Sequence, residues 1–271
     1  MLSDLRFALR QLRKSPGFTF VAILTLSLGI GANIAIFSVI NAVLLRPLPY
    51  PDSERIMTLH ERDSKRNDFA ISLPDYLDWK RDNTVFENLA LYRTYSLNLS
   101  GIKGRPAEPI SSALVTANFF KVAGLAPELG RTFTEAEDKK GAPALVVISD
   151  LLWTRAFGRD PDVLGRPVTF HDTRYTVIGV MPPTLRAPTD TGAWFSLMRR
   201  NNPAWETRMN HPLMYGWGRL KPGVTVEQAR TQLATIAARL EKQHPESNND
   251  VHAVVTPLLE NLVGKYRTNL G

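Results

Sequence analysis

The chain has 271 residues, of which 44% are hydrophobic and 22% are charged, and it contains no cysteine. This length can bury a core unaided, and the missing cysteine excludes a disulfide framework, a cysteine-ligated zinc site and a catalytic thiol. The net charge is +7, and five basic residues against one acidic residue give residues 1–46 a charge of +4. Because this excess lies beside a long apolar segment, it indicates a membrane rather than a nucleic acid.

The first segment, residues 1–16, combines basic residues with the apolar spacing of one helix face, at Leu5, Leu9 and Leu12. We expect this segment to lie on the cytoplasmic membrane surface, with its cations near anionic lipid. The alternative is a charge cluster that only sets topology. The candidate membrane-surface residues are Arg6, Arg10, Arg13 and Lys14.

Residues 17–46 predict a transmembrane helix. No charged residue occurs from Gly17 to Leu45, and about 20 apolar residues are enough to cross a bilayer. A cleaved signal peptide, the competing interpretation, would have a shorter apolar region followed by a small-residue cleavage site. Four basic residues precede the span and only Arg46 follows it, which predicts a cytoplasmic N-terminus and extracytoplasmic residues 47–271.

The predicted span carries a stripe of small side chains and two amides. Small residues let neighbouring helices approach closely, and amides in an apolar span seek partners on other helices. We therefore expect this face to pack against further membrane helices, although membrane helices are in general rich in small residues. The helix-packing candidates are Ser27, Gly31, Ala35, Ser38 and Ala42, with the amides of Asn33 and Asn41.

Residues 47–120 predict a first β-α-β unit, with strands at 55–60 and 87–97. Between the strands, Ser72 can cap a helix that has Pro74 in its first turn.

Residues 210–271 predict a second unit of the same kind, with strands at 214–220 and 251–256. Its helix begins at a capping box, Thr225 to Gln228, and continues with an apolar face. Two such units at opposite ends of one region indicate a split α/β sandwich with an insert.

The insert, residues 121–209, predicts a mostly β subdomain. A continuous apolar strand is expected at 144–148, and a hairpin turns at His171-Asp172. Tracts 138–143 and 182–212 are rich in turn-forming residues and predict loops. The predicted fold class is therefore α+β: one N-terminal transmembrane helix, an extracytoplasmic domain of two β-α-β units, and an inserted β-rich subdomain.

Sequence patterns for catalysis or cofactor binding are missing. The segment from Gly124 to Thr132 has the wrong spacing for a phosphate loop, and no two histidines lie close enough for a local zinc pair. Ser149 is expected to cap a helix rather than act as a nucleophile, and the acidic residues at 135–138 are expected to form a solvated loop. We predict no catalytic residue, no metal and no cofactor.

The exported part has no concentrated basic face, so no nucleic-acid partner is predicted. Most of the five tryptophans are expected to pack in the core. Trp194, Trp205 and Trp217 lie in or near the least regular segment, and they are the candidates for a surface that binds a periplasmic partner protein.

Several motifs together resemble MacB/FtsX-type ABC transporter permeases, in particular the branch of duplicated orphan permeases. The membrane-proximal motifs are Leu9-x-x-Leu12-Arg13-Lys14-Ser15-Pro16-Gly17-Phe18, Leu26-x-x-Gly29-Ile30-Gly31-Ala32-Asn33 and Leu45-Arg46-Pro47-Leu48-Pro49-Tyr50. The motifs that resemble the family's periplasmic core domain are Asn118-Phe119-Phe120 with Gly124, Gly130-Arg131-x-Phe133, Val147-Ile148-Ser149, Phe157-Gly158, Asp160-Pro161, Leu164-Gly165 and Tyr175-x-Val177-Ile178-Gly179-Val180-Met181-Pro182.

The resemblance implies a fold and a function. Family members have one helix, a large extracytoplasmic domain with an α/β porter part and a β-rich sabre part, and three more helices. By this resemblance, residues 47–120 and 210–271 are porter-like, and residues 121–209 are sabre-like. A separate cytoplasmic ABC ATPase, the only component that binds ATP, moves the helices, and the domain transmits the motion to periplasmic partners or substrate in efflux or extrusion.

The resemblance also implies the bacterial inner membrane and a dimer or pseudo-dimer. The chain ends at Gly271, close to where the family's second membrane helix is expected, so a fragment of a longer permease and a truncated product are both expectations. The alternative function is a single-pass, membrane-anchored periplasmic binding or scaffold protein. An anchored hydrolase would require a Ser/His/Asp cluster assembled by the fold.

Overall fold

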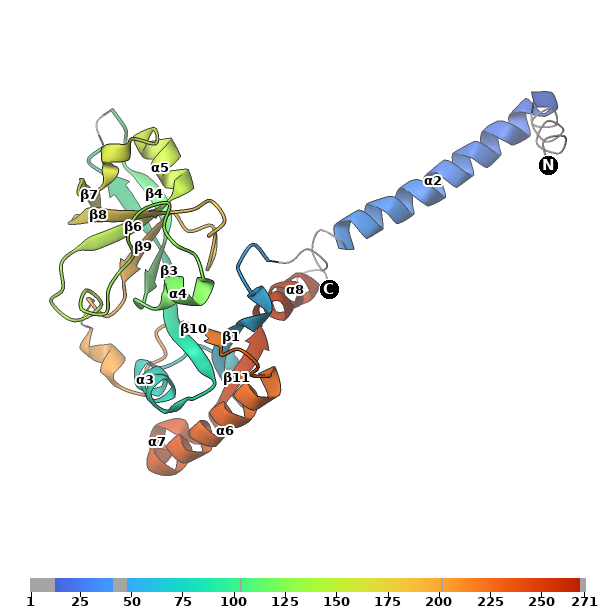
Figure 1. Ribbon diagram of the computed structural model, residues 1–271. Helices are drawn as coiled ribbons and strands as arrows, with labels where there is room; N and C mark the ends of the chain where they lie inside the picture. Colours follow the sequence, from blue (N-terminus) through green and yellow to red (C-terminus); the bar gives the residue numbers. More distant parts are fainter. Residues whose placement is uncertain (1–12, 41–47, 103, 201, 269–271) are drawn as a thin grey trace. The chain divides into compact units, whose positions relative to one another are not determined.

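The structure is a computed structural model that describes residues 13–40, 48–102, 104–200 and 202–268, with the backbone alone for 35–40, 263 and 265–268. The chain forms two compact units, Met1–Pro47 and Leu48–Gly271. In the first unit, helix α2 (Pro16–Ile40) is apolar and long enough to cross a membrane (Figure 1). This confirms the predicted helix from its first turn to Ile40, and the predicted remainder to residue 46 lies outside the described residues.

The second unit is built on an 11-stranded sheet. Nine of its strands follow the order β11-β1-β10-β3-β4-β9-β6-β8-β5, and of the other two, β2 pairs with β1 and β7 pairs with β3 and β8. The strands are β1 (Ile56–Asp63), β2 (Asn67–Phe69), β3 (Phe86–Ser100), β4 (Glu108–Val115), β5 (Leu129–Gly130), β6 (Leu145–Ser149), β7 (Pro167–Phe170), β8 (Thr173–Met181), β9 (Ala193–Ser196), β10 (Tyr215–Leu220) and β11 (His252–Pro257). The helices are α3 (Leu73–Asp82), α4 (Phe119–Ala123), α5 (Asp150–Phe157), α6 (Val226–Gln243), α7 (Pro245–Asn248) and α8 (Leu258–Thr268), with 3₁₀ turns η2 (Ser53–Arg55), η3 (Pro161–Val163) and η4 (Pro203–Glu206).

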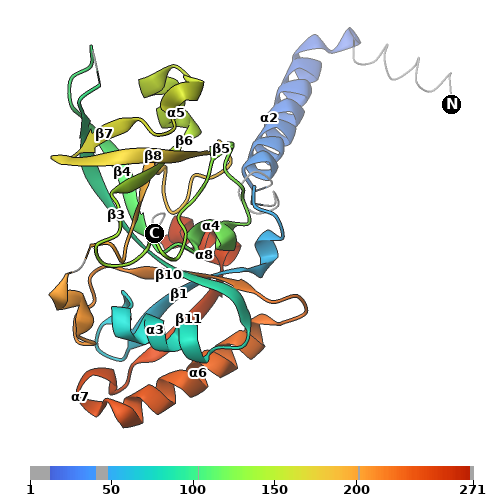
Figure 2. The same cartoon turned by 60° about the vertical axis from the view of Figure 1, so that its left-hand side comes forward.

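The two predicted β-α-β units are present, and they interleave. In the order β11-β1-β10-β3 every neighbouring pair is antiparallel, so the two strands of each unit are parallel and enclose one strand of the other unit. This is the split β-α-β arrangement. Helices α3 and α6 lie on one face of these four strands (Figure 2). We call this part the four-stranded half.

Local sequence accounts for the two helices of the four-stranded half. Ser72 accepts the Asp75 amide at the start of α3, and Thr225 and Gln228 form the predicted reciprocal capping box of α6. The α6 side chains that face the sheet recur at helical spacing, and all of them are buried. They are Ala229, Leu233, Ile236, Ala237 and Leu240.

Strand β3 joins the four-stranded half to the β-rich remainder. Its 15 residues pair with β10 over the first part, to Tyr92, and with β4 from Tyr92 onward. The remainder, which we call the β-rich half, contains the predicted hairpin β7–β8, whose turn residues His171 and Asp172 both have positive φ. One continuous sheet therefore runs through the unit from β11 to β5 (Figures 1 and 2).

The loop prediction for 182–212 is wrong in part, because this tract contains β9 and η4. Strand β4 was not predicted at all. These two strands pair in parallel, and β9 lies between β4 and β6 inside the sheet. The domain boundaries at 120/121 and 209/210 stay a prediction, and the pairing of β4 with β9 crosses them.

Candidate functional site

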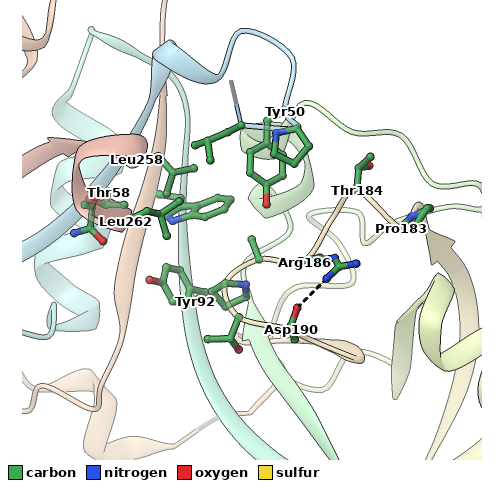
Figure 3. Close-up of a pocket in the computed structure, with 16 residues that line it drawn as sticks. Tyr50, Thr58, Tyr92, Pro183, Thr184, Arg186, Asp190, Leu258 and Leu262 are labelled. Atoms are coloured by element: carbon green, nitrogen blue, oxygen red, sulfur yellow. Dashed lines mark ion pairs between the residues drawn. The ribbon is translucent and has the colours of Figure 1, made fainter. Parts of the chain in front are cut away.

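A cleft of about 680 Å³ opens on the face of the four-stranded half that is opposite α3 and α6 (Figure 3). Three segments surround it: residues 48–50, the loop 183–190 of the β-rich half, and the first turns of α8. Strands β1, β3 and β10 contribute its floor. The lining residues are Leu48, Pro49, Tyr50, Thr58, Tyr92, Pro183, Thr184, Arg186, Ala187, Pro188, Thr189, Asp190, Trp217, Leu258, Asn261 and Leu262.

The floor of the cleft is aromatic because strand register brings rings from different elements together. Thr58 of β1 lies opposite Trp217 of β10, and Tyr215 of β10 lies opposite Tyr92 of β3. The Trp217 ring packs edge-on against Tyr50 at 6.0 Å and against Tyr92 at 6.2 Å between centroids. Such edge-to-face contacts are favourable and hold the rings in fixed orientations.

Two charged side chains line the cleft, and they pair with each other. The guanidinium Nη1 of Arg186 lies 3.8 Å from Asp190 Oδ1, and both side chains are largely exposed (78% and 83%) (Figure 3). The Arg186 backbone also tethers the loop, because its amide donates to the Tyr50 hydroxyl. Burial raises the pKa of Tyr50, so this phenol stays neutral at physiological pH.

A smaller hollow of about 340 Å³ continues the cleft along β1 and shares Thr58, Tyr92 and Asn261 with it. Its charged groups are also paired, since Asp68 lies 3.2 Å from His60 Nε2 and 2.5 Å from Arg62 Nε. These contacts lower the pKa of Asp68, with Arg62 the largest cause. The whole cleft therefore presents apolar and neutral polar surface, with its charges neutralised in pairs.

A second polar cluster is buried on the opposite side of the sheet, at the start of α3. Arg208 donates to Asp75 Oδ1 at 2.5 Å and also to Asp78, and the Asn248 amide donates to Asp75 at 2.9 Å. These contacts fasten the segment before β10 to α3 and α7. The cluster therefore fixes this segment on the helices of the four-stranded half.

Glu61 of β1 lies beside this cluster with no exposed surface, and its Oε2 is 3.0 Å from His211 Nδ1. Burial, followed by the charge of Asp75, raises the pKa of Glu61 well above its ordinary value. Burial also lowers the pKa of His211. Both shifts favour the neutral form of each group.

The structure corrects the sequence-based choice of a tryptophan surface. The side chains of Trp194, Trp205 and Trp217 are buried, at 0%, 5% and 3% exposed. Trp194 belongs to β9, inside the sheet, and its indole donates to the Ala187 carbonyl at 3.1 Å. Trp217 lines the cleft, where its ring contributes to the floor.

The structure describes part of the predicted membrane residues. Ser27, Gly31 and Asn33 are exposed along α2, and Arg13 and Lys14 are exposed beside it. For Ala35 and Ser38 only their place in α2 is described. Arg6, Arg10, Asn41 and Ala42 lie outside the described residues. Helix packing and membrane-surface binding stay predictions for all these positions.

The residues considered for chemistry have structural partners. Ser149 accepts the Leu152 amide and caps α5, as predicted. The solvated-loop interpretation of residues 135–138 is wrong for Asp138, because its carboxylate accepts from the Ala117 amide, the Ser196 hydroxyl and the Met198 amide. Within the described part of the chain, no group of three metal-ligating side chains comes together.

The comparison with protein families matches residues 19–236 to the MacB-like periplasmic core domain. This match spans well over half of the chain, and it begins within α2. The chain belongs to this family. The comparison with curated proteins found no match.

Solved structures share the fold. The periplasmic region of MacB from Actinobacillus actinomycetemcomitans is 14% identical, with a TM-score of 0.58 over 84% of this chain and 98% of that chain. The extracellular domain of the noncanonic ABC-type transporter YknZ from Gram-positive bacteria is 15% identical, with a TM-score of 0.53 over 73% and 99%. A domain of a Porphyromonas gingivalis protein that is described by inference as a permease is 17% identical, with a TM-score of 0.60 over 77% of this chain and 93% of that chain.

These findings establish the coarse function. A MacB-like core domain that follows an apolar helix makes the chain a membrane-anchored protein with an extracytoplasmic domain, of the ABC-type transporter permease family. Domains of this permease type are in general non-catalytic.

Proposed function

We propose that this chain is the non-catalytic permease subunit of a MacB/FtsX-type ABC transport complex in the bacterial inner membrane. A cytoplasmic ATPase moves its membrane helices, and the extracytoplasmic domain passes this motion to a periplasmic partner or substrate in efflux or extrusion. ATP enters only through that separate ATPase. The functional unit is a dimer or pseudo-dimer in which the small-residue face of α2 packs on further permease helices.

One observation supports the mechanical part of the proposal: the segment that follows α2 in sequence and helix α8 meet at one place. Leu48 and Tyr50, which follow the membrane segment in sequence, pack in the same cluster as Leu258 and Leu262 of α8, around Trp217. Strand β1 begins at this point and pairs with both β10 and β11. A displacement of residues 48–50 or of α8 therefore acts on the centre of the four-stranded half.

The sheet supplies a stiff path from that point to the other half. Strand β3 is hydrogen-bonded to β10 in the four-stranded half and to β4 in the β-rich half. Strands in a hydrogen-bonded ladder resist independent movement, so a push on β1 and β10 also displaces the β-rich half.

The alternative function is a single-pass anchored scaffold. In the permease α2 must pack against further membrane helices, whereas in the scaffold it needs to contact only lipid. Gly31 is in the predicted packing stripe and Gly29 is on another helix face, and a Cβ added at either position meets open space within the described chain. Gly31→Leu and Gly29→Leu are therefore matched variants that leave the chain's own fold intact.

The test is co-purification of the tagged chain with the other permease helices from native membranes. We expect Gly31→Leu to lower the recovered complex about tenfold or more, as expected when a small-residue contact is lost, and Gly29→Leu to leave it unchanged. Equal recovery of both variants at the level of the unaltered chain would contradict the permease assignment of this helix and favour the scaffold.

A further inference from the structure

The cleft has the size and walls of a small-molecule site. Its volume of about 680 Å³ lies within the roughly 300–1,000 Å³ of ligand pockets. Aromatic rings form the floor and leucines close one side, and the ring contacts around Trp217 keep this surface preformed. A flat or ring-bearing molecule can stack on such a floor, because aromatic faces favour offset or edge contacts with other rings.

The charges in the cleft argue against an ionic ligand. Arg186 and Asp190 compensate each other at the exposed edge. In the adjoining hollow, Asp68 is paired with His60 and Arg62. An anion or cation entering the cleft would have to displace one of these pairs, and it would lose its own hydration. An uncharged molecule meets neither cost.

Two neutral polar groups remain available at the floor. Neither the side-chain amide of Asn261 nor the hydroxyl of Tyr92 is hydrogen-bonded to any part of the chain that the structure describes. Both line the cleft and the adjoining hollow. A ligand with one or two hydrogen-bonding groups would satisfy them, and a few such groups in an apolar pocket are what set the orientation of a bound molecule.

We propose that this cleft binds an uncharged, ring-bearing small molecule that stacks on the half-buried rings of Tyr50 and Tyr92, above the buried Trp217, and hydrogen-bonds to the Asn261 side chain. The loop 183–190 and α8 form opposite walls, so the bound molecule bridges the β-rich half and the four-stranded half. This site is additional to the permease function proposed above and does not depend on it.

Because the chain contains no cysteine, single cysteines can report occupancy of the cleft in the whole 271-residue chain. Asn261→Cys places the thiol in the cleft on α8, and Thr189→Cys places it on the opposite wall. Glu260→Cys is the matched control, since Glu260 precedes Asn261 on the same helix, is exposed and does not line the cleft. The rate of alkylation by N-ethylmaleimide is measured with and without ligand.

The probe ligand is N-phenyl-1-naphthylamine, an uncharged aromatic amine, compared with 8-anilino-1-naphthalenesulfonate, which adds a sulfonate to the same rings. Since Asn261→Cys removes the proposed hydrogen bond, the Kd of the uncharged probe is measured for each variant. At about ten times that Kd, the probe should slow alkylation at positions 189 and 261 about tenfold by occupancy. It should leave position 260 unchanged, and the sulfonate should protect less at equal concentration.

Three outcomes would overturn the proposal. Absence of protection at both 189 and 261 would show that no such ligand occupies the cleft. Equal slowing at 260 and 261 would show partitioning of the probe into the membrane mimic. Protection by the sulfonate equal to or better than that by the uncharged probe would show that the site selects an anion. If Asn261→Cys does not fold, Thr189→Cys decides alone.

Discussion

Replacing Arg208 by Met should destabilise the extracytoplasmic domain. The loss of stability should be larger than that caused by an arginine-to-methionine change in a solvent-exposed ion pair. The Arg208 side chain is 17% exposed, and its guanidinium contacts the carboxylates of Asp75 and Asp78, whose side chains are 3% and 9% exposed. Met keeps most of the apolar stem and removes the charge. The substitution therefore leaves two buried carboxylates with less compensation.

The size of this effect follows from the partners that remain. Breaking a buried ion pair by removing one partner costs about 3–5 kcal/mol. After the substitution, Asp75 still accepts from Asn248 and Ser72, and Asp78 still has Arg81 at 2.6 Å. The loss should therefore lie at the lower end, about 3 kcal/mol. For a domain of this size it corresponds to a fall of roughly 6–12 °C in Tm.

The assay is urea and thermal unfolding of residues 48–271, followed by tryptophan fluorescence. Arg81→Met is the matched control, because Arg81 pairs with the same Asp78 but is 66% exposed, and exposed pairs contribute only about 0–1 kcal/mol. A loss below about 1 kcal/mol for Arg208→Met, or equal losses for the two variants, would refute the reasoning that burial makes this pair important.

Three further predictions concern single positions of the same domain. Glu61→Gln should remove a loss of stability that sets in as the pH rises above about 5. The folded chain holds the Glu61 proton more tightly than an unfolded carboxyl with a pKa of 4.5, so each pH unit costs up to about 1.4 kcal/mol until the folded carboxyl ionises, and unfolding midpoints that change equally with pH in both chains would contradict this. Gly179→Ala should cost more than about 2 kcal/mol in urea unfolding, because the new Cβ would lie 2.2 Å from the Arg131 carbonyl oxygen, whose backbone cannot move aside; a change within about 0.5 kcal/mol would show that β8 yields there. Thr225→Ala should cost about 1 kcal/mol through loss of the α6 capping box, with Thr225→Ser as the conservative control, and equal stability of the two variants would argue against the cap.

Elements with strong local signals could be predicted from sequence. Helix α6 has both a capping box and apolar residues at helical spacing, and these two signals set its start and its buried face without reference to the rest of the chain. The hairpin β7–β8 was predictable for the same reason, since alternating apolar residues flank a two-residue turn.

Elements that depend on distant partners could not be predicted. Strand β4 contains Pro109 and two serines, which are typical of loops, and its pairing with β9 joins residues far apart in the chain. The burial of Trp194 follows from that pairing. The cleft is likewise non-local, because it forms only when the loop 183–190 lies against β1, β3 and α8.

The central claim, that the extracytoplasmic domain moves in response to the ATPase, is tested most directly by cross-linking across the cleft in inverted native membrane vesicles. Thr184→Cys with Asn261→Cys spans the two walls, and Thr84→Cys with Gln232→Cys, at positions that are hydrogen-bonded within the four-stranded half, is the control pair. A membrane-permeant bismaleimide reports each distance. We expect the cross-linking rate of the cleft pair to change when ATP and vanadate are added, while that of the control pair stays constant. A cleft-pair rate that is the same in every nucleotide state would contradict the account.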